Sequence, residues 1–418
     1  MLFALLIPVI FIAIGGAIDF NRVIQLHGRM QDAADIASVG SIVANSAAYK
    51  ASQSMGNGTI AIGGQKAQDI YNANFFQPKD LTNLKITAQV TKSGSILNSS
   101  VVVTANYKPY MLGLIGVSAI PVTATSTSSS NLPPFMDVYL LLDNSPSMGV
   151  GATTADINKM VANTSDKCAF ACHQDDKPGS DYYALAKTLS VTMRIDVLRQ
   201  ATQKLMSTAK ETETVGGQYR MAIYDFGKAA DAIDPQNPGP FQISALTTDL
   251  DQSATNASAI DLMTIPKSNY NSDRQTNFQT VLQGMNIVIP QPGDGTSSAK
   301  PQQVLFFVSD GANDSYDCAY SNGNTCRRIT PLDTTTCNAM KARGVRIAVL
   351  YTTYLPLPTN DFYKKWMDGY ISPTSQIAAK MQACASDGLF FEVGPDQGIS
   401  EAMSALFKKV VSVVRINS

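Results

Sequence analysis

Two apolar segments that each lead into an aspartate constrain the fold of this chain more than any other feature. Residues Val138–Leu142 form the first segment, and Asp143 follows directly. Residues Val304–Val308 form the second, and Asp310 closes it after one serine. Continuous apolar runs of this length are typical of strands that are buried on both faces, as in parallel sheets. Ligands of open α/β sheets bind at the carboxyl ends of the strands, so we expect both aspartates at a ligand-binding edge.

From Phe135 onward, predicted strands and helices alternate, which indicates an α/β fold with a doubly wound, mostly parallel sheet. The predicted strands lie near residues 136–142, 219–226, 303–309, 345–351 and 389–393. The predicted helices lie near residues 193–212, 277–288, 332–343, 372–386 and 397–414. Residues 149–190 intervene between the first strand and the first long helix, and we interpret them as an insertion beside the ligand-binding edge.

Oxygen-bearing side chains gather around these strand ends. Asp143, Ser145 and Ser147 place one carboxylate and two hydroxyls on a single turn. Thr276 precedes a predicted helix, and Asp310 ends the second strand. Hard oxygen ligands with little net charge suit Mg²⁺ (or Mn²⁺ or Ca²⁺) rather than zinc. The alternative is that Asp143 caps a helix and the serines lie in a turn.

The order Asp-x-Ser-x-Ser, then Thr, then Asp resembles the von Willebrand factor A domain and its metal-ion-dependent adhesion site. The resemblance implies that Ser145 and Ser147 ligate the metal directly. It implies that Asp143, Thr276 and Asp310 hold the metal directly or through water. It also implies an open coordination position that accepts an acidic side chain from a protein partner.

The N-terminal segment, Met1–Ala17, is apolar apart from glycine and one proline, and the first charged residue is Asp19. A membrane span needs about 20 residues, so this segment is at the short end. A cleaved signal peptide is the alternative, because Gly15-Gly16-Ala17 offers a small-x-small site. However, no basic segment precedes the apolar run, and the helical pattern continues past it. We therefore predict an uncleaved transmembrane anchor over residues 1–18.

A second resemblance covers the same region. Residues 15–20 and 26–37 are similar to the N-terminus of TadE/TadG-like proteins of tight-adherence (Flp) pilus systems, in which a membrane helix leads into an "LQ-x-AADAA" helix. Here residues 30–37 read MQDAADIA. Together with a C-terminal von Willebrand A-like domain, the resemblance implies a TadG-like protein that takes part in assembling or presenting adhesive pili. Family members usually carry a basic segment before the membrane helix, and this sequence starts at the helix itself.

The region between the anchor and the α/β domain has a different character. We predict a pilin-like domain over residues 19–127, in which the N-terminal helix is followed by antiparallel strands near residues 84–90, 99–107 and 120–126. The Ser/Pro segment 128–134 is predicted to be a linker. Residues 135–418 form the predicted von Willebrand A-like domain.

All six cysteines lie in this last domain, and none belongs to a zinc-ribbon pattern. Their even number and the loops that they bracket favour disulfides in an oxidising compartment over six free thiols in the cytosol. The preferred pairing is Cys168–Cys172, Cys318–Cys326 and Cys337–Cys384. Arg22 and Arg29 follow the apolar segment and by themselves favour the opposite orientation. We give precedence to the cysteines and the family, and place the C-terminal domain in the periplasm or outside the cell.

Composition excludes one large class of partner. The formal net charge is −1 and there is no basic excess, so nucleic-acid binding has no electrostatic support. We expect instead a protein partner, other pilus-assembly proteins and, through the N-terminal helix, a membrane.

Enzymatic function also finds little support. A Ser-His-Asp hydrolase needs a histidine, and the chain has two, His27 and His173. Neither Ser145 nor Ser147 lies in a G-x-S-x-G elbow. A zinc site on His173 and its neighbouring cysteines lacks a fourth ligand at suitable spacing. We expect a binding protein rather than an enzyme. A pilus-independent surface adhesin is the alternative, and a serine hydrolase that uses Ser145 is a third hypothesis.

Overall fold

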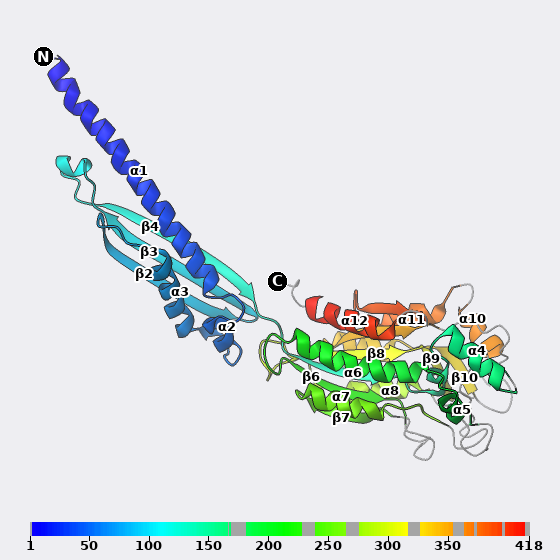
Figure 1. Ribbon diagram of the computed structural model, residues 1–418. Coiled ribbons are helices and arrows are strands. Elements are labelled where there is room, and N and C mark those ends of the chain that lie inside the picture. Colours follow the sequence, from blue (N-terminus) through cyan, green and yellow to red (C-terminus); the bar gives the residue numbers. More distant parts are fainter. Residues whose placement is uncertain are drawn as a thin grey trace. The chain divides into compact units, whose positions relative to one another are not determined.

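The computed structural model describes residues 2–165, 167–168, 181–227, 239–264, 276–316, 327–353, 363–371, 374–394 and 398–413. The chain divides into two compact units, Met1–Pro133 and Pro134–Ser418 (Figure 1).

In unit 1 the long helix α1 and the shorter helix α3 share one core with an antiparallel sheet of order β1-β2-β3-β4. Its helices are α1 (Leu2–Gly40), α2 (Ala47–Ser52), η1 (Leu112–Ile115) and α3 (Ala61–Asn74). Its strands are β1 (Gly58–Thr59), β2 (Leu81–Ser93), β3 (Ile96–Tyr107) and β4 (Ile120–Asn131). Figure 1 shows α1 lying along β4 and extending beyond the sheet at its N-terminal end.

The segment that resembles TadE/TadG-like proteins supplies the contact between α1 and the sheet. Met30, Ala33, Ala34 and Ala37 are buried at helical spacing and share one core with β3 and β4. Alanine side chains at these positions allow the helix backbone to approach the sheet closely. Side chains of β3 alternate between this core and the other face, as expected for a strand with one covered side.

Strand β4 is longer than the sequence predicted. It runs from Ile120 to Asn131 and enters the segment 128–134 that we predicted to be a linker. The reason is pairing: Ser128 and Ser130 lie opposite Ser99 and Leu97 of β3, so the ladder continues through the serines. In the part of the chain that the structure describes, no helix combines the length and apolarity needed to cross a membrane. The anchor over residues 1–18 stays a prediction.

Unit 2 is an α/β fold whose six-stranded sheet has the order β12-β11-β8-β5-β6-β7. Its strands are β5 (Met136–Leu142), β6 (Tyr219–Asp225), β7 (Phe241–Thr247), β8 (Gln302–Ser309), β11 (Arg346–Thr352) and β12 (Phe390–Val393). All pairs are parallel except β6 with β7. The five predicted strands are therefore confirmed, and the antiparallel edge strand β7 is an addition.

Helices cover both faces of this sheet, as a doubly wound fold requires. Alternate residues of β5 enter the two cores: Leu140 packs with α6 and α12, and Leu141 packs with α8, α9 and α11. The helices are α4 (Thr154–Asn163), α5 (Tyr182–Thr188), α6 (Arg194–Thr212), α7 (Leu250–Asn256), α8 (Phe278–Val288), α9 (Thr335–Ala342), α10 (Asp368–Ile371), α11 (Gln376–Cys384) and α12 (Ile399–Val413). Two short 3-10 helices are η2 (Pro146–Gly149) and η4 (Ala257–Ala259), and η7 (Tyr363–Met367) is a π-helix. Strand β9 (Ala312–Tyr316) pairs with β10 (Arg327–Pro331) in a small separate ribbon.

The strand order creates one topological switch point. From β5 the chain continues to β6 and β7 on one side, and later strands β8, β11 and β12 are added on the other. In open α/β sheets the crevice at this point, beyond the carboxyl ends of the strands, is where ligands bind. The residues that follow β5 and β8 therefore lie where ligands bind in sheets of this kind.

Candidate metal centre

Asp143 and Asp310 lie at the switch point, directly beyond the carboxyl ends of neighbouring strands. β5 and β8 run parallel with Leu142 opposite Val308, and the N–H of Asp143 donates to the carbonyl of Val308 over 2.9 Å. Both carboxylates are fully buried. The structure thus brings together two aspartates that are 167 positions apart in the chain, as the sequence predicted for strand ends at one edge.

The loop after β5 holds its oxygens in a tight turn. The N–H of Ser145 donates to Oδ1 of Asp143 over 2.9 Å. The hydroxyls of Ser145 and Ser147 lie 3.0 Å apart, and the turn η2, with Pro146 at its start, keeps them on one side. Ser145 is buried and Ser147 is half-buried, so the pair leads from the interior toward the surface.

Thr276 reaches the same region from the segment before α8. Its carbonyl accepts the N–H of Asp314 over 2.7 Å, which joins it to β9, the strand that begins two residues after Asp310. Asn313 caps this junction, since its side-chain oxygen accepts the N–H of Phe278 over 3.1 Å. Thr276 is itself buried. Four of the five predicted residues are thus fixed on short, hydrogen-bonded connections around the two strand ends, and Ser147 stands at the rim.

Ser309 is a residue that the sequence analysis did not single out. Its hydroxyl donates to Oδ2 of Asp143 over 2.5 Å and accepts the N–H of Gly311 over 2.9 Å. It therefore links the loop after β5 to the loop after β8. In the sequence it is the last residue of an apolar strand, and no motif marks it as a residue of a binding site.

Asn144 is a second such residue, at a spacer position of the Asp-x-Ser-x-Ser motif. Its side-chain oxygen accepts the N–H groups of Phe226 and Gly227, both over 3.1 Å. Its amide nitrogen donates to the carbonyl of Gly227 over 2.6 Å and to Asp225 over 3.2 Å. Its own carbonyl accepts the N–H of Met263 over 2.8 Å. Asn144 therefore fastens the serine-bearing loop to the end of β6, and Asp225 serves as one of its supports.

The electrostatics of the site favour an added positive charge. Burial raises the pKa of Asp143 well above its usual range, and the nearby carboxylate of Asp310 raises it further. Hydrogen bonds from Ser145 and Ser309 act in the opposite direction. Two buried carboxylates in mutual repulsion, with hydroxyls beside them, match the oxygen ligands that Mg²⁺, Mn²⁺ or Ca²⁺ prefers. Within the described ranges no three His, Cys, Asp or Glu side chains gather, so the hydroxyls would have to complete such a ligand set.

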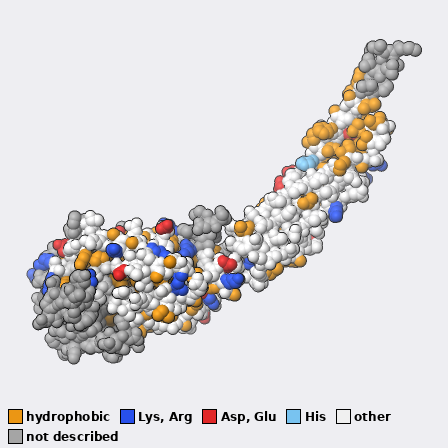
Figure 2. All heavy atoms as spheres, turned by 180° about the vertical axis from the view of Figure 1, so that it is seen from behind, with side chains coloured by type: hydrophobic (Ala, Val, Ile, Leu, Met, Phe, Trp, Pro, Cys, Tyr) orange, Lys and Arg blue, Asp and Glu red, His pale blue; other side chains and the backbone are white. Residues whose placement is uncertain are grey.

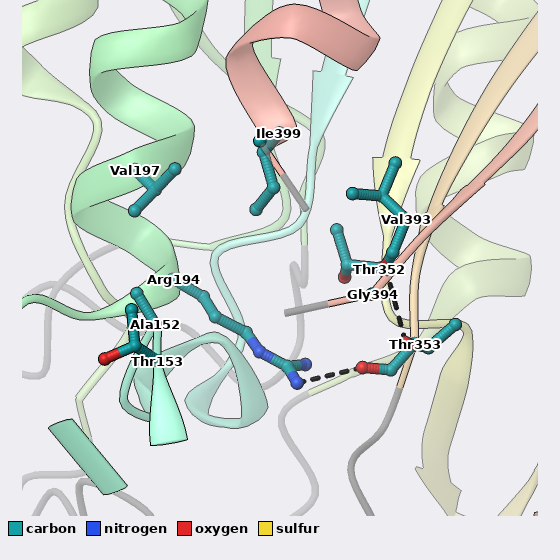
Figure 3. Close-up of a pocket in the computed structure, with 10 residues that line it drawn as sticks. Ala152, Thr153, Arg194, Val197, Thr352, Thr353, Val393, Gly394 and Ile399 are labelled. Carbon is teal, nitrogen blue, oxygen red and sulfur yellow. Dashed lines mark hydrogen bonds between the residues drawn. The ribbon is translucent and has the colours of Figure 1, made fainter. Parts of the chain in front are cut away.

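A separate cavity of about 240 Å³ opens at the ends of the outer strands (Figure 3). Thr352 of β11, Val393 of β12 and Ile399 of α12 line it. Arg194 enters from the start of α6 and donates to the carbonyl of Thr353 over 2.9 Å. None of the five predicted site residues lines this cavity.

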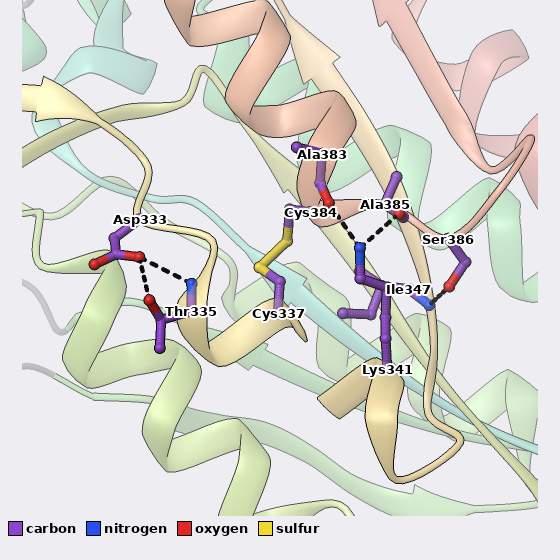
Figure 4. The surroundings of a disulfide bond; sticks show 9 residues. All are labelled: Asp333, Thr335, Cys337, Lys341, Ile347, Ala383, Cys384, Ala385 and Ser386. Carbon is purple, nitrogen blue, oxygen red and sulfur yellow. Dashed lines mark hydrogen bonds between the residues drawn. A yellow bond between two sulfur atoms is a disulfide. The ribbon is translucent and has the colours of Figure 1, made fainter. Parts of the chain in front are cut away.

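One of the three predicted disulfides is confirmed. Cys337 and Cys384 are bonded and fully buried, and they tie α9 to α11 (Figure 4). Lys341 reinforces the same junction by donating to the carbonyls of Ala383 and Ala385. Cys168 is disulfide-bonded as well. Cys172, Cys318, Cys326 and His173 lie outside the described residues, and so do the pairings predicted for those cysteines.

The first 40 residues of the chain match the family described as "Putative Flp pilus-assembly TadE/G-like". No curated protein matches the chain.

Three solved structures are similar to this chain. They are the pilus adhesin SpaC from Lactobacillus rhamnosus GG (12% identity, TM-score 0.38, 81% of this chain and 35% of SpaC); the von Willebrand factor domain of the type V pili tip protein Mfa5 from Porphyromonas gingivalis (11%, 0.34, 68% and 96%); and proximal thread matrix protein 1 from the mussel byssus, with a zinc-occupied MIDAS motif (11%, 0.32, 67% and 46%). The chain spans 35% of SpaC and less than half of the mussel protein. The first 40 residues of the chain thus match the TadE/G-like Flp pilus-assembly family, and its second unit is an α/β domain with a mixed six-stranded sheet.

Proposed function

We propose that this protein is a membrane-anchored, exported component of a Tad-type pilus system, and that its second unit binds a protein partner through a divalent cation. The observation that carries the proposal is the placement of Asp143 and Asp310 side by side at the switch point of the sheet, with the serine loop against them. The TadE/G-like N-terminus supports the link to pili.

Each residue of the site has a role in this proposal. Ser145, Ser147 and Thr276 would hold Mg²⁺, or Mn²⁺ or Ca²⁺, and Asp143 and Asp310 would balance its charge. A bound cation of this kind supplies a position that accepts a carboxylate from a partner. Ser309 and Asn144 keep the two aspartates and the serine loop in place before any ion or partner arrives. Preorganisation of this kind lowers the cost of ordering on binding.

We further propose that the site binds and does not catalyse. The hydroxyl of Ser145 is buried and paired with that of Ser147. Among the described residues the only histidine is His27, which is exposed on α1 in unit 1. A nucleophilic serine needs an adjacent general base.

The proposed anchor is the apolar N-terminal part of α1, which continues without a break into the helix that packs on the sheet. The side chains of Phe11 and Ile14 on this part are exposed, as expected for a segment that contacts lipid. The Cys337–Cys384 disulfide supports placement of unit 2 in an oxidising compartment. A fusion of alkaline phosphatase after Ser418 should be active in cells. An inactive fusion would contradict export.

Metal binding is tested by titrating the full chain with MgCl₂ and MnCl₂ in a calorimeter and by following thermal unfolding. A ligand at 100 times its dissociation constant stabilises the folded state by about 2.7 kcal/mol. We expect wild type to show this gain and the double variant Asp143→Ala/Ser145→Ala to lose it. Asp251→Ala is the matched control, because it removes an exposed carboxylate of the same unit whose ion pair is with Lys210. Equal affinity in wild type and the double variant would overturn the proposal.

A further inference from the structure

Apolar side chains are exposed on two segments of unit 1 that are far apart in the sequence but lie at the same end of the unit. The first is the N-terminal part of α1, where the side chain of Phe11 is 71% exposed. The second is the turn 110–117 between β3 and β4, where Leu114 is 83% and Tyr110 70% exposed, with Met111 and Ile115 beside them. Figure 2 shows hydrophobic side chains gathered toward the N-terminal end of unit 1.

The turn touches α1 within its apolar part. A Cβ added to Gly15 would lie 2.7 Å from Cβ of Met111, and one added to Gly16 would lie 3.5 Å from Cδ2 of Leu112. Only glycine at position 15 allows this approach. Figure 1 shows the turn beside the helix, beyond the end of the sheet. The turn therefore stands at the level of residues that precede Asp19, the first charge of the chain.

A buried carboxylate fixes the base of the turn. Asp19 accepts hydrogen bonds from the hydroxyl of Tyr107 over 2.9 Å and from the N–H groups of Tyr110, Met111 and Leu112 over 3.0, 2.9 and 2.7 Å. One helical turn further, Arg22 binds Asp80 over 2.8 Å, and the carbonyl of Asp80 accepts the N–H of Lys108. The hydrogen bonds to Asp19 and Asp80 therefore fix the position of the exposed apolar residues of the turn.

Three further N–H groups of the turn are also hydrogen-bonded within the protein. The N–H groups of Leu114, Gly116 and Val117 donate to carbonyls of the same turn, over 3.1, 3.2 and 3.1 Å. A non-helical segment tolerates a hydrocarbon environment only when its backbone polar groups are satisfied by the protein. The turn meets this condition for the N–H groups of residues 110, 111, 112, 114, 116 and 117.

We propose that the turn 110–117 inserts into the same lipid leaflet as the N-terminal part of α1, so that unit 1 contacts the membrane at two places. The inference rests on the membrane anchor of the proposed function and extends it. The occupant is a phospholipid surface because the turn continues the apolar face of a segment that enters lipid. The turn is too short to span, so it lies at the boundary between headgroups and acyl chains.

The distribution of polar residues fits this depth. Tyr110 stands at the edge of the apolar tip, and tyrosine is enriched at membrane–water interfaces. Lys108 is exposed at the base of the turn, where it suits anionic headgroups. From residue 109 to residue 136 the chain carries no charged side chain. Two contacts with one leaflet would fix the tilt of unit 1, which a single helix leaves free.

Fluorescence quenching by lipids with brominated acyl chains tests the proposal on the full chain in vesicles. Trp366 is the only tryptophan, so Trp366→Phe gives a silent background. Into it we would introduce Leu114→Trp, Phe11→Trp and Asn98→Trp one at a time, all at exposed positions. Asn98 is the control, because it lies nine residues from Tyr107 along β3, about 30 Å away at 3.3 Å per residue.

We expect brominated lipid to quench Leu114→Trp and Phe11→Trp alike, with a blue-shifted emission, and to leave Asn98→Trp unchanged. If Phe11→Trp is quenched and Leu114→Trp is not, the turn stays in water and the inference is overturned while the anchor stands. If neither is quenched, the anchor itself fails and the inference fails with it. The two failures are therefore distinguishable.

Discussion

The side-chain amide of Gln31 on α1 forms a two-way pair with the backbone of Thr125 on β4. It donates to the carbonyl of Thr125 over 2.9 Å and accepts its N–H over 3.3 Å. β4 is an edge strand of the sheet, and edge strands offer unpaired backbone groups to other chains. Gln31 thus occupies groups that a further strand would use. It belongs to the MQDAADIA segment, whose buried residues pack α1 on the same sheet.

Replacing Gln31 by alanine should expose the middle of this edge. We expect faster amide hydrogen exchange in the peptide that contains Thr125 and a loss of about 0.5–1.5 kcal/mol in the free energy of unfolding, the usual net contribution of a hydrogen bond. Exchange mass spectrometry and denaturant unfolding measure the two effects. Gln65→Ala is the control, because Gln65 bonds only Asp69 on its own exposed helix face. Unchanged exchange at Thr125 would show that the edge does not depend on Gln31.

In our proposal Asn144 does not contact the metal, but it holds in place the loop that carries Ser145 and Ser147. Asn144→Ala leaves the N–H groups of Phe226 and Gly227 without their acceptor, and an unsatisfied buried group costs roughly 1–3 kcal/mol. We expect lower stability of unit 2 and weaker Mg²⁺ binding. Thermal unfolding and calorimetry on the same samples measure both. Thr255→Ala, which removes an exposed hydroxyl that bonds only within α7, is the control. Wild-type affinity in Asn144→Ala would mean that the loop holds its shape unaided.

Asn144 and Ser309 mark the limit of what the sequence predicts about the site. The strands were predictable because continuous apolar runs must be buried on both faces, and Asp143 and Asp310 were predictable because they end such runs. Asn144 and Ser309 were not, since their partners are supplied by strands 81 and 166 positions away. β7 was missed for a different reason: it is an edge strand whose side chains are mostly half-buried or exposed, so it lacks the apolar signal.

Removing the Cys337–Cys384 bridge should destabilise unit 2. The bridge closes a loop of 47 residues, for which the chain-entropy model gives roughly 4 kcal/mol. We expect Cys337→Ala/Cys384→Ala to unfold at a clearly lower temperature than wild type under non-reducing conditions. Alkylation of protein from the native envelope, followed by mass spectrometry without reduction, should find no free thiol at these two cysteines. Free thiols there would contradict the proposed export.

Acid should loosen the turn 110–117 through Asp19. Burial acts to raise the pKa of Asp19, but hydrogen bonds from the N–H of Leu112 and from the hydroxyl of Tyr107 outweigh it, so the pKa lies below its ordinary value. A carboxylate with a lowered folded-state pKa contributes stability above its unfolded pKa of about 3.9, and that stability is lost as the pH falls through the folded value.

We therefore expect amide exchange of residues 110–112, corrected for the intrinsic rate, to be constant from neutral pH down to about pH 4 and to accelerate below it. Asp19→Asn keeps the shape of the side chain but removes the charge, so it should exchange faster at neutral pH and show no such step. Asp69→Asn, at an exposed acid paired with Lys66, serves as the control and should behave like wild type. An acid step that persists in Asp19→Asn would assign the titration to another group and leave the turn without its proposed support.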